Sequence, residues 1–182
     1  MTVRDILMFG DDRLRQKAFA VDLLHDDWQG DAADLTETLA SLKSRFNFGN
    51  ALAGPQIGSR YRMIAFDGSL GSFLAINPCI TWFSAEMFPV WDDCFSLPSV
   101  CAAVMRHREI SFECVDQTGA SISFPRLSDA QAELVQHEID HLDGILMVDR
   151  LVRPGAIIAR EMVKQARHPG LVDLIEKSEP RK

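Results

Sequence analysis

Apolar positions recur at helical spacing in the first half of the chain. Leu35, Leu39, Leu42 and Phe46 follow one another at intervals of three or four residues, which places them on one face of a helix. The polar and glycine-containing segment that follows is typical of a helix end. We therefore predict a helix from about Asp31 to Phe46 whose apolar stripe faces a core.

The same spacing predicts two further helices nearer the C-terminus. One begins near Ser128, which forms a capping box with Gln131, and runs through an apolar stripe to a stop at Gly144. The other covers about residues 154–167, with Pro154 in its first turn and a His-Pro-Gly stop after it.

Between these helices, residues 61–124 are rich in β-branched and aromatic residues. They contain five candidate strands: Arg62–Phe66, Phe73–Ile76, Ile80–Phe83, Ile110–Val115 and Ser121–Phe124. Turns are predicted at 67–68, 77–78 and 117–119. The pattern predicts one α+β domain over residues 1–182, with a mostly antiparallel sheet and a polar tail at 177–182.

Composition and charge narrow the function classes. The 182 residues are 47% hydrophobic and carry a net charge of −7, which argues against a nucleic-acid partner because phosphate binding needs a basic face. Residues 1–20 mix charged and apolar side chains, so neither an export signal nor a membrane span is expected. We therefore expect a cytoplasmic protein without a membrane partner, whose four cysteines stay reduced.

The helix expected after Ser128 contains the sequence His137-Glu138-Ile139-Asp140-His141. Histidines four residues apart lie on one helical face, where their imidazoles can share a divalent metal ion. Glu138 projects close to that face and can carry a proton beside the metal without binding it. The same five residues can also occur on a solvated helix face, so the motif needs further support.

A catalytic site of this kind needs a third protein ligand. Glu161 and His168 lie downstream, as in zincin-type proteases, whereas Cys94 lies upstream in a polar turn where a thiolate would be exposed. Spacing alone does not decide between these alternatives.

Three separated segments resemble the motifs of one family, in the same order. Gly49 to Ile57 resembles the GxGxAAxQ segment of peptide deformylases, Asp92 to Ser96 resembles EGCLS, and Gln136 to His141 resembles QHExDH. With the opening around Ile6 to Arg15, the likeness covers about residues 5–150. It implies the peptide deformylase fold, in which a mostly antiparallel sheet surrounds a central HExxH helix, with one helix before it and one after it.

The resemblance also implies a site and a reaction. Its metal ligands would be Cys94, His137 and His141, with Fe(II) as the metal and Zn or Ni as substitutes. Its catalytic groups would be Glu138, Gln56 and the backbone N–H of Phe95, the last two stabilising the oxyanion. Its substrate-binding residues would be Gly49, Asn50, Ala51 and Asp93. The reaction would be removal of formate from the N-formyl-methionine of a peptide or nascent chain, with the ribosome as a further partner.

Several positions depart from the family pattern. Asp92-Asp93 stands in place of Glu-Gly, Ala51 in place of a glycine, and Cys101 in place of an arginine. We expect Asp93 to narrow the substrate groove and, as an anion near the metal, to oppose ionisation of water there. Two alternatives follow: a hydrolase for another N-formyl or N-acyl amine, and a metal-binding relative without catalysis.

Overall fold

The structure, a computed structural model, describes residues 2–46 and 49–164 and has the α+β architecture predicted from the sequence. Its α-helices are α1 (Gln29–Phe46), α2 (Asp129–Leu142) and α3 (Arg160–Lys164). Its strands are β1 (Ala51–Ala53), β2 (Met63–Gly68), β3 (Gly71–Phe83), β4 (Met87–Cys94), β5 (Leu97–His107), β6 (Glu109–Val115), β7 (Ser121–Ser128) and β8 (Ile157–Ala159). Three short 3₁₀ helices complete it: η1 (Asp12–Arg15), η2 (Gly54–Ile57) and η3 (Met147–Arg150).

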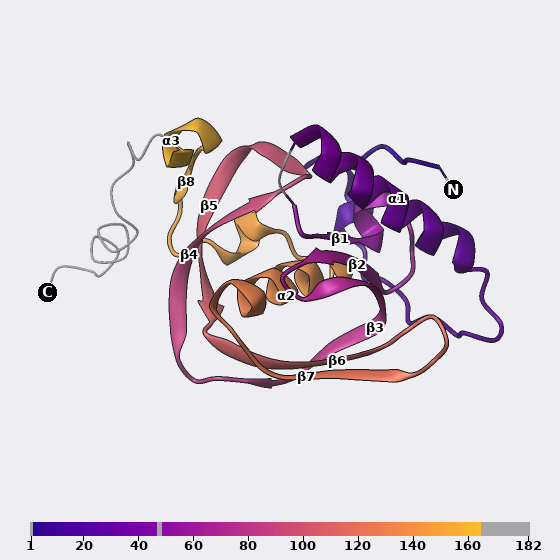
Figure 1. Cartoon of the computed structure of the whole chain (residues 1–182). Helices are drawn as coiled ribbons and strands as arrows, with labels where there is room; N and C mark the ends of the chain where they lie inside the picture. The colour runs from indigo at the N-terminus through magenta and orange to yellow at the C-terminus, as the bar shows by residue number, and fades with distance from the viewer. Residues whose placement is uncertain (1, 47–48, 165–182) are drawn as a thin grey trace, which may run out of the picture.

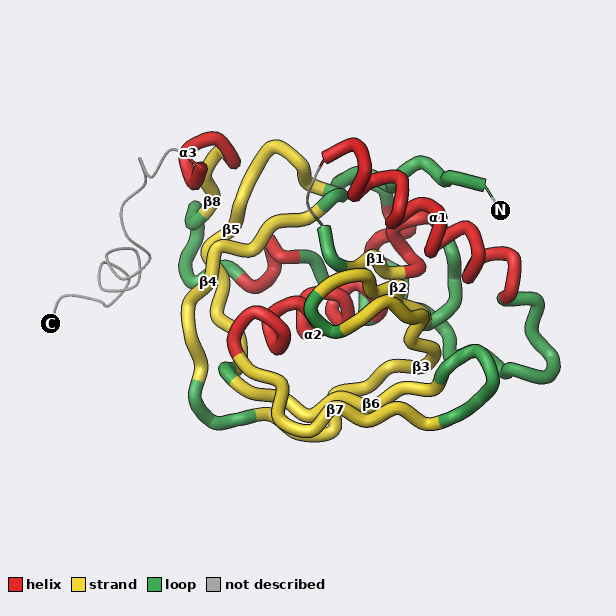
Figure 2. Tube along the Cα trace, in the orientation of Figure 1, coloured by secondary structure: helices red, strands yellow, loops and turns green. Residues whose placement is uncertain are grey.

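The strands form two antiparallel sheets, and α2 lies between them. Within the described residues, one sheet has the order β1-β2-β3-β6-β7 and the other the order β4-β5-β8. Figure 1 shows α2 in the middle of the molecule, with β1 and β2 on one side, β3, β6 and β7 on the opposite side, and β4 and β5 crossing one end. The tube in Figure 2 shows the same enclosure. The central helix predicted from the motif is confirmed.

The inward face of α2 is apolar, which holds the helix in this position. Val135 and Leu142 are fully buried and belong to the same core cluster as Ile64 and Phe112 of the larger sheet. Burying side chains of this size stabilises the fold by about 1.5–3 kcal/mol each. Side chains elsewhere on α2 are therefore fixed relative to the larger sheet.

The predicted capping box at the start of α2 was wrong. Ser128 lies at the N-cap position in extended conformation, but its side chain makes no capping hydrogen bond. The Gln131 amide instead donates to the backbone oxygen of Ser69, in the turn between β2 and β3. The Gln131 side chain, which the local pattern assigned to the helix cap, therefore makes a contact with a residue distant in sequence.

Helix α1 follows the prediction closely, starting two residues earlier than expected. Leu35, Leu39 and Leu42 are buried against a second cluster that includes Leu52 and Met63. Figure 1 shows α1 on the outer side of β1 and β2, away from α2. The segment 51–57 is thereby held between two helices.

The strands differ from the prediction in two respects. The turn predicted at 77–78 lies inside the single strand β3, where the register shifts and Asn77 adopts a positive φ of 51°. The Asn77 side chain bonds the backbone of Val21 through both its oxygen and its nitrogen. The long hairpin of β4 and β5 was not among the five candidate strands, although it carries Cys94 at the end of its first strand.

The C-terminal segment also differs from the prediction. Residues 157–159 are not helical but form β8, which pairs with residues 100–102 of β5. The helix begins only at Arg160, and its predicted end at 165–167, like the tail at 177–182, lies outside the described residues. In the part of the chain that is described, no helix is both long enough and apolar enough to cross a membrane.

Candidate metal centre and its pocket

The end of β4 and the middle of α2 bring three ligand-type side chains together. One ligand atom from each of Cys94, His137 and His141 lies within 4.8 Å of the others, and Sγ of Cys94 is 3.2 Å from Nε2 of His141. Sulfur and nitrogen ligands of one tetrahedral ion lie about 2.3 and 2.0–2.1 Å from it, which requires spacings of this order. The donor set therefore fits one metal ion.

Burial of the three side chains supports the same reading. Cys94, His137 and His141 are 4%, 6% and 1% exposed. Cys94 is therefore buried, whereas the sequence had suggested an exposed thiolate. Burial lowers the pKa of His141 well below its ordinary value, with the charge of His137 adding to this effect. A neutral imidazole is the form that binds a metal.

Behind the ligands lies a buried network of ion pairs. Oδ1 of Asp92 is 2.7 Å from Nδ1 of His137, and the guanidinium of Arg106 bonds Asp92 at 2.7 Å and Asp140 at 2.5 Å. Burial by itself would raise the pKa of Asp92, but the charges of His137 and Arg106 hold it at about 2. A carboxylate on Nδ1 fixes the ring so that Nε2 faces the metal position.

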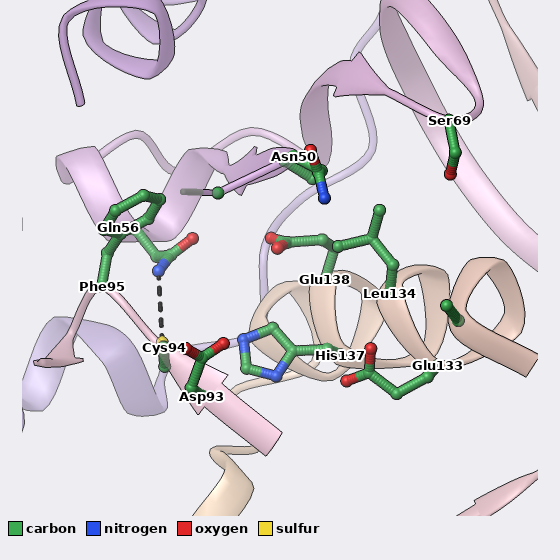
Figure 3. Close-up of a pocket in the computed structure, with 13 residues that line it drawn as sticks. Asn50, Gln56, Ser69, Asp93, Cys94, Phe95, Glu133, Leu134, His137 and Glu138 are labelled. Carbon is green, nitrogen blue, oxygen red and sulfur yellow. Dashed lines mark hydrogen bonds between the residues drawn. The ribbon is translucent and has the colours of Figure 1, made fainter. Parts of the chain in front are cut away.

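Glu138 follows the first histidine, and its carboxylate points into the cavity that His137 also lines (Figure 3). It is 4% exposed, and its Oε2 atom has no hydrogen-bond partner among the described residues. Burial raises its pKa to about 7, against the opposing charge of His137. A carboxyl group with this pKa can both accept and release a proton near neutral pH.

Gln56 faces the ligands from the 3₁₀ helix η2. Its Oε1 accepts a hydrogen bond from the backbone of Ala53, which fixes the amide so that Nε2 points to Sγ of Cys94 at 3.5 Å and to Oγ of Ser96 at 3.3 Å. Figure 3 shows this amide directed toward Cys94. The side chain thus presents a donor, as an oxyanion-stabilising group must.

The four residues predicted to bind substrate all line the cavity, whose volume is about 290 Å³. Gly49, however, has a packing role. Its φ is +93°, and a Cβ at this position would lie 2.2 Å from the ring of Phe95. Glycine is therefore required for the aromatic ring to lie against the chain just before β1.

Asp93 does not act as the isolated anion that the sequence suggested. Its carboxylate lies 2.6 Å from Nη1 of Arg160, at the start of α3, and its side chain is 48% exposed. The register explains the contact, because Asp93 is opposite Cys101 on β5, and Cys101 is opposite Ile158 on β8. The arginine offsets the charge that we expected to act on the metal.

Four residues of the site were missed as functional groups: Asp92, Arg106, Glu133 and Arg160. Three depend on pairing across strands, which has no local signature in the sequence. Glu133 could have been found, because it lies four residues before His137 and therefore on the same helical face. Glu161, the alternative ligand, is exposed on α3 and does not join the histidines, and His168 lies outside the described residues.

An antiparallel fold around a helix with two histidine ligands and a buried glutamate defines a metal-dependent hydrolase. Known proteins agree. The sequence profile of the family described as polypeptide deformylase matches residues 3–156. A peptide deformylase of Dictyoglomus thermophilum is 35% identical over 82% of this chain and 94% of its own, and peptide deformylase 2 of a Nostoc species is 32% identical over 80% and 84%.

Solved structures show the same likeness. The crystal structure of peptide deformylase from Thermotoga maritima matches with a TM-score of 0.73 and 28% identity, over 83% of this chain and 99% of that one. A Synechococcus elongatus peptide deformylase in complex with actinonin matches with a TM-score of 0.72 and 28% identity, over 90% and 83%. The chain belongs to the peptide deformylase family, metallo-hydrolases that remove the formyl group from an N-terminal methionine and use a single catalytic metal.

Proposed function

We propose that this chain hydrolyses the N-formyl group of newly made polypeptides with Glu138 as its proton carrier. The observation that carries the proposal is the unpaired Oε2 of this buried side chain, which faces the cavity beside three converging metal ligands. A purely metal-binding relative would have no need to keep a carboxyl group buried without a partner, because such burial is costly.

A residue can be assigned to each step of the proposed reaction. A metal held by Cys94, His137 and His141 would supply Lewis acidity. The Glu138 carboxylate takes a proton from the attacking water and passes it to the nitrogen of the leaving amine. The amide of Gln56 and the backbone N–H of Phe95 would donate to the formyl oxygen as negative charge develops on it.

For the metal we propose Fe(II), with Zn or Ni as functional substitutes. One thiolate and two imidazoles suit these borderline ions, whereas Mg²⁺ and Ca²⁺ prefer oxygen ligands. The carboxylate behind His137 makes the imidazole more basic and so favours binding of the ion.

For the substrate we propose an extended N-formyl peptide, free or at the end of a nascent chain. Among the described residues, β1 and β4 each lie at the edge of a sheet and line the same cavity, and the backbone of an extended peptide can pair with such an edge. Action near the ribosome, in the cytoplasm, would follow from a nascent-chain substrate.

The test is formate release from formyl-Met-Ala-Ser by the Fe(II)-loaded protein under anaerobic conditions. We expect turnover well above the Glu138→Ala variant, which keeps the ligands and serves as the matched control. Equal rates for the two proteins, each with stoichiometric metal, would contradict the proposed function.

A further inference from the structure

A second cavity lies beside the 3₁₀ helices η1 and η2, and it shares no lining residue with the cavity at the metal ligands. Its volume is about 70 Å³, and its walls come from residues 13–19 and 55–60. Two backbone hydrogen bonds of 2.8 Å hold these segments together: the Phe19 N–H donates to the carbonyl of Arg60, and the Arg62 N–H donates to the carbonyl of Phe19. The backbone around this second cavity is therefore fixed.

The walls of the second cavity are cationic, although the chain has a net charge of −7. Arg13, Lys17 and Arg60 line it, and among the residues that the structure describes no aspartate or glutamate does so. Asp11, which is not part of the lining, accepts hydrogen bonds from Nε and Nη2 of Arg13 at 2.9 and 2.6 Å. This fork orients the guanidinium and leaves the Nη1 donors for a ligand. Nη1 lies 3.5 Å from the point that a Cβ on Gly58, another wall residue, would occupy.

The other two cations lack a full counter-charge. Nζ of Lys17 is 3.7 Å from an Asp143 oxygen that also lies 2.7 Å from Arg62. Arg60 makes no ion pair in the described part of the chain, and its guanidinium donates to the hydroxyl of Tyr61 at 3.2 Å. Lys17 and Arg60 therefore keep most of their positive charge uncompensated.

Ser59 adds a buried donor to the same walls. It is 6% exposed, and its Oγ accepts a hydrogen bond from the N–H of Tyr61 at 3.3 Å. Its own hydroxyl hydrogen has no acceptor among the described residues. A buried hydroxyl that donates to nothing costs free energy, and an anion in the cavity would offset that cost.

Phe19 places an aromatic ring beside these cations. Its side chain is 66% exposed, although its backbone is held by both of the hydrogen bonds to residues 60–62. Single exposed apolar side chains are common on protein surfaces, but this one lines a cationic cavity. A ring fixed in this position can stack on an aromatic group of a ligand whose anionic end lies between the cations.

The size and charge of the second cavity narrow the class of ligand. A volume of about 70 Å³ holds roughly two water molecules at about 30 Å³ each, which suffices for an ionic group and leaves the rest of a ligand outside, against Phe19. A phosphate monoester carries a charge of about −1.5 to −2 near pH 7, which matches the two uncompensated cations, Lys17 and Arg60. A carboxylate, or a phosphodiester within a nucleic-acid strand, carries a single charge and matches them less well.

We propose that the second cavity binds a phosphate monoester that carries an aromatic group, as a mononucleotide does. Arg13, Lys17 and Arg60 bind the phosphate, the Ser59 hydroxyl donates to one of its oxygens, and the aromatic group stacks on Phe19. The inference goes beyond the proposed function and does not depend on it, because binding can be measured in protein that does not turn over substrate.

The test measures dissociation constants by calorimetry at low ionic strength, where exposed charges are least screened. The probes are adenosine monophosphate, ribose 5-phosphate and adenosine, which contain both groups, the phosphate alone and the aromatic base alone. We expect adenosine monophosphate to bind at least about tenfold more tightly than either of the others. An adenosine affinity equal to that of the nucleotide would overturn the proposal, since the phosphate would then contribute nothing.

Variants assign the two parts of the ligand to the walls of the second cavity. Arg60→Gln should weaken both phosphate-containing probes by about tenfold, whereas Arg126→Gln removes another exposed arginine, on β7, and should change neither. Phe19→Ala should weaken the nucleotide by about fivefold or more and leave ribose 5-phosphate unchanged. Phe83→Ala, at an exposed aromatic residue of β3, is its matched control and should have no effect.

Three further outcomes would overturn the proposal. Equal nucleotide affinity in Arg60→Gln and Arg126→Gln would show that the cavity is not the binding site. Loss of binding in Cys94→Ala, with unchanged affinity in Arg60→Gln, would place the nucleotide at the metal centre. Tighter binding of an oligoadenylate without a terminal phosphate than of the mononucleotide would identify a nucleic-acid strand as the ligand instead.

Discussion

The charged side chains on the two sides of α2 differ in whether they have a partner within the protein. On the side facing β5, Asp140 is bound by two arginines, and Arg106 links it to Asp92 behind the first histidine. On the side facing the cavity, Glu133 has no partner among the described residues and Glu138 keeps one oxygen unpaired. The three acids that α2 contributes, Glu133, Glu138 and Asp140, lie within eight consecutive positions of the helix.

This difference distinguishes residues that orient the metal ligands from residues that are available to a proton or a substrate. Charges that are paired inside the protein fix the imidazole ring of His137 and do not respond to a ligand. Charges that lack a protein partner are available to a proton or a substrate, at a cost to the stability of the fold. The contrast predicts that substitutions on the two sides have different consequences.

The largest effect of a substitution is expected at the proposed metal ligands, which lie between the two sides. Cys94→Ala and His137→Ala should each reduce bound metal from about one ion per chain to nearly none, because two remaining ligands hold an ion only weakly. Metal content by mass spectrometry is the measurement. Cys79→Ser, at an exposed cysteine of β3, is the matched control and should keep its metal. Stoichiometric metal in Cys94→Ala would exclude this ligand set.

On the cavity side, Glu138→Ala should keep the metal and lose the hydrolytic rate by several orders of magnitude, since the variant lacks the group that moves the proton. Rate and metal content are measured on the same sample. A variant that retained most of its rate would show that another group carries the proton.

On the paired side, Arg106→Met should destabilise the protein by about 3–5 kcal/mol, because it removes the buried arginine that both Asp92 and Asp140 share. Urea unfolding gives the free energy. Arg108→Met removes an exposed arginine that also bonds two acids, and it should cost less than about 1 kcal/mol. Similar losses of unfolding free energy in the two variants would show that the buried and the exposed ion pairs do not differ in their contribution to stability.

The two sides should also respond to pH in opposite directions in the metal-free protein. The folded pKa of Glu138 is raised from 4.5 to about 7, so the unfolded state loses its proton first and stability falls as pH rises between these values. The folded pKa of Asp92 is lowered from 3.8 to about 2, so its contribution is lost as pH falls through that range.

Denaturant unfolding at several pH values measures both effects. Glu138→Gln should remove a decline on the order of 2–3 kcal/mol between pH 4.5 and 7, the size that the shift implies. An unchanged pH dependence in this variant would mean that Glu138 is not held in its protonated form by burial.

The sequence predicted the parts of the fold that local periodicity encodes. Helices α1 and α2 follow from apolar spacing, and the three ligands follow from motifs that resemble those of a family. Strand β4 was missed because Pro89 and the pair Asp92-Asp93 interrupt any alternation, and only its pairing with β5 makes it extended. The start of the C-terminal helix was misplaced for a related reason, since pairing with β5 overrides the helical spacing of Ile157 and Ile158.

The prediction of the site was limited in the same way, because contacts between distant strands could not be predicted. Asp92 orients His137, but the sequence showed it only as a departure from a motif. Its role could not be predicted because its partner Arg106 lies 14 positions away on the neighbouring strand. Asp93 was read as an unpaired anion because nothing local in the sequence connects it with Arg160. Contacts of this kind are set by strand register and chain topology.

The ion pair between Asp93 and Arg160 has a consequence for how the protein is made. A ribosome adds amino acids at about 5–20 per second, so Arg160 is synthesised roughly one to four seconds after His141, the last metal ligand. During that interval the chain contains the complete ligand set and Asp93 without its counter-charge. Metal capture can therefore precede formation of the Asp93–Arg160 ion pair, and synthesis itself imposes an order on the assembly of the site.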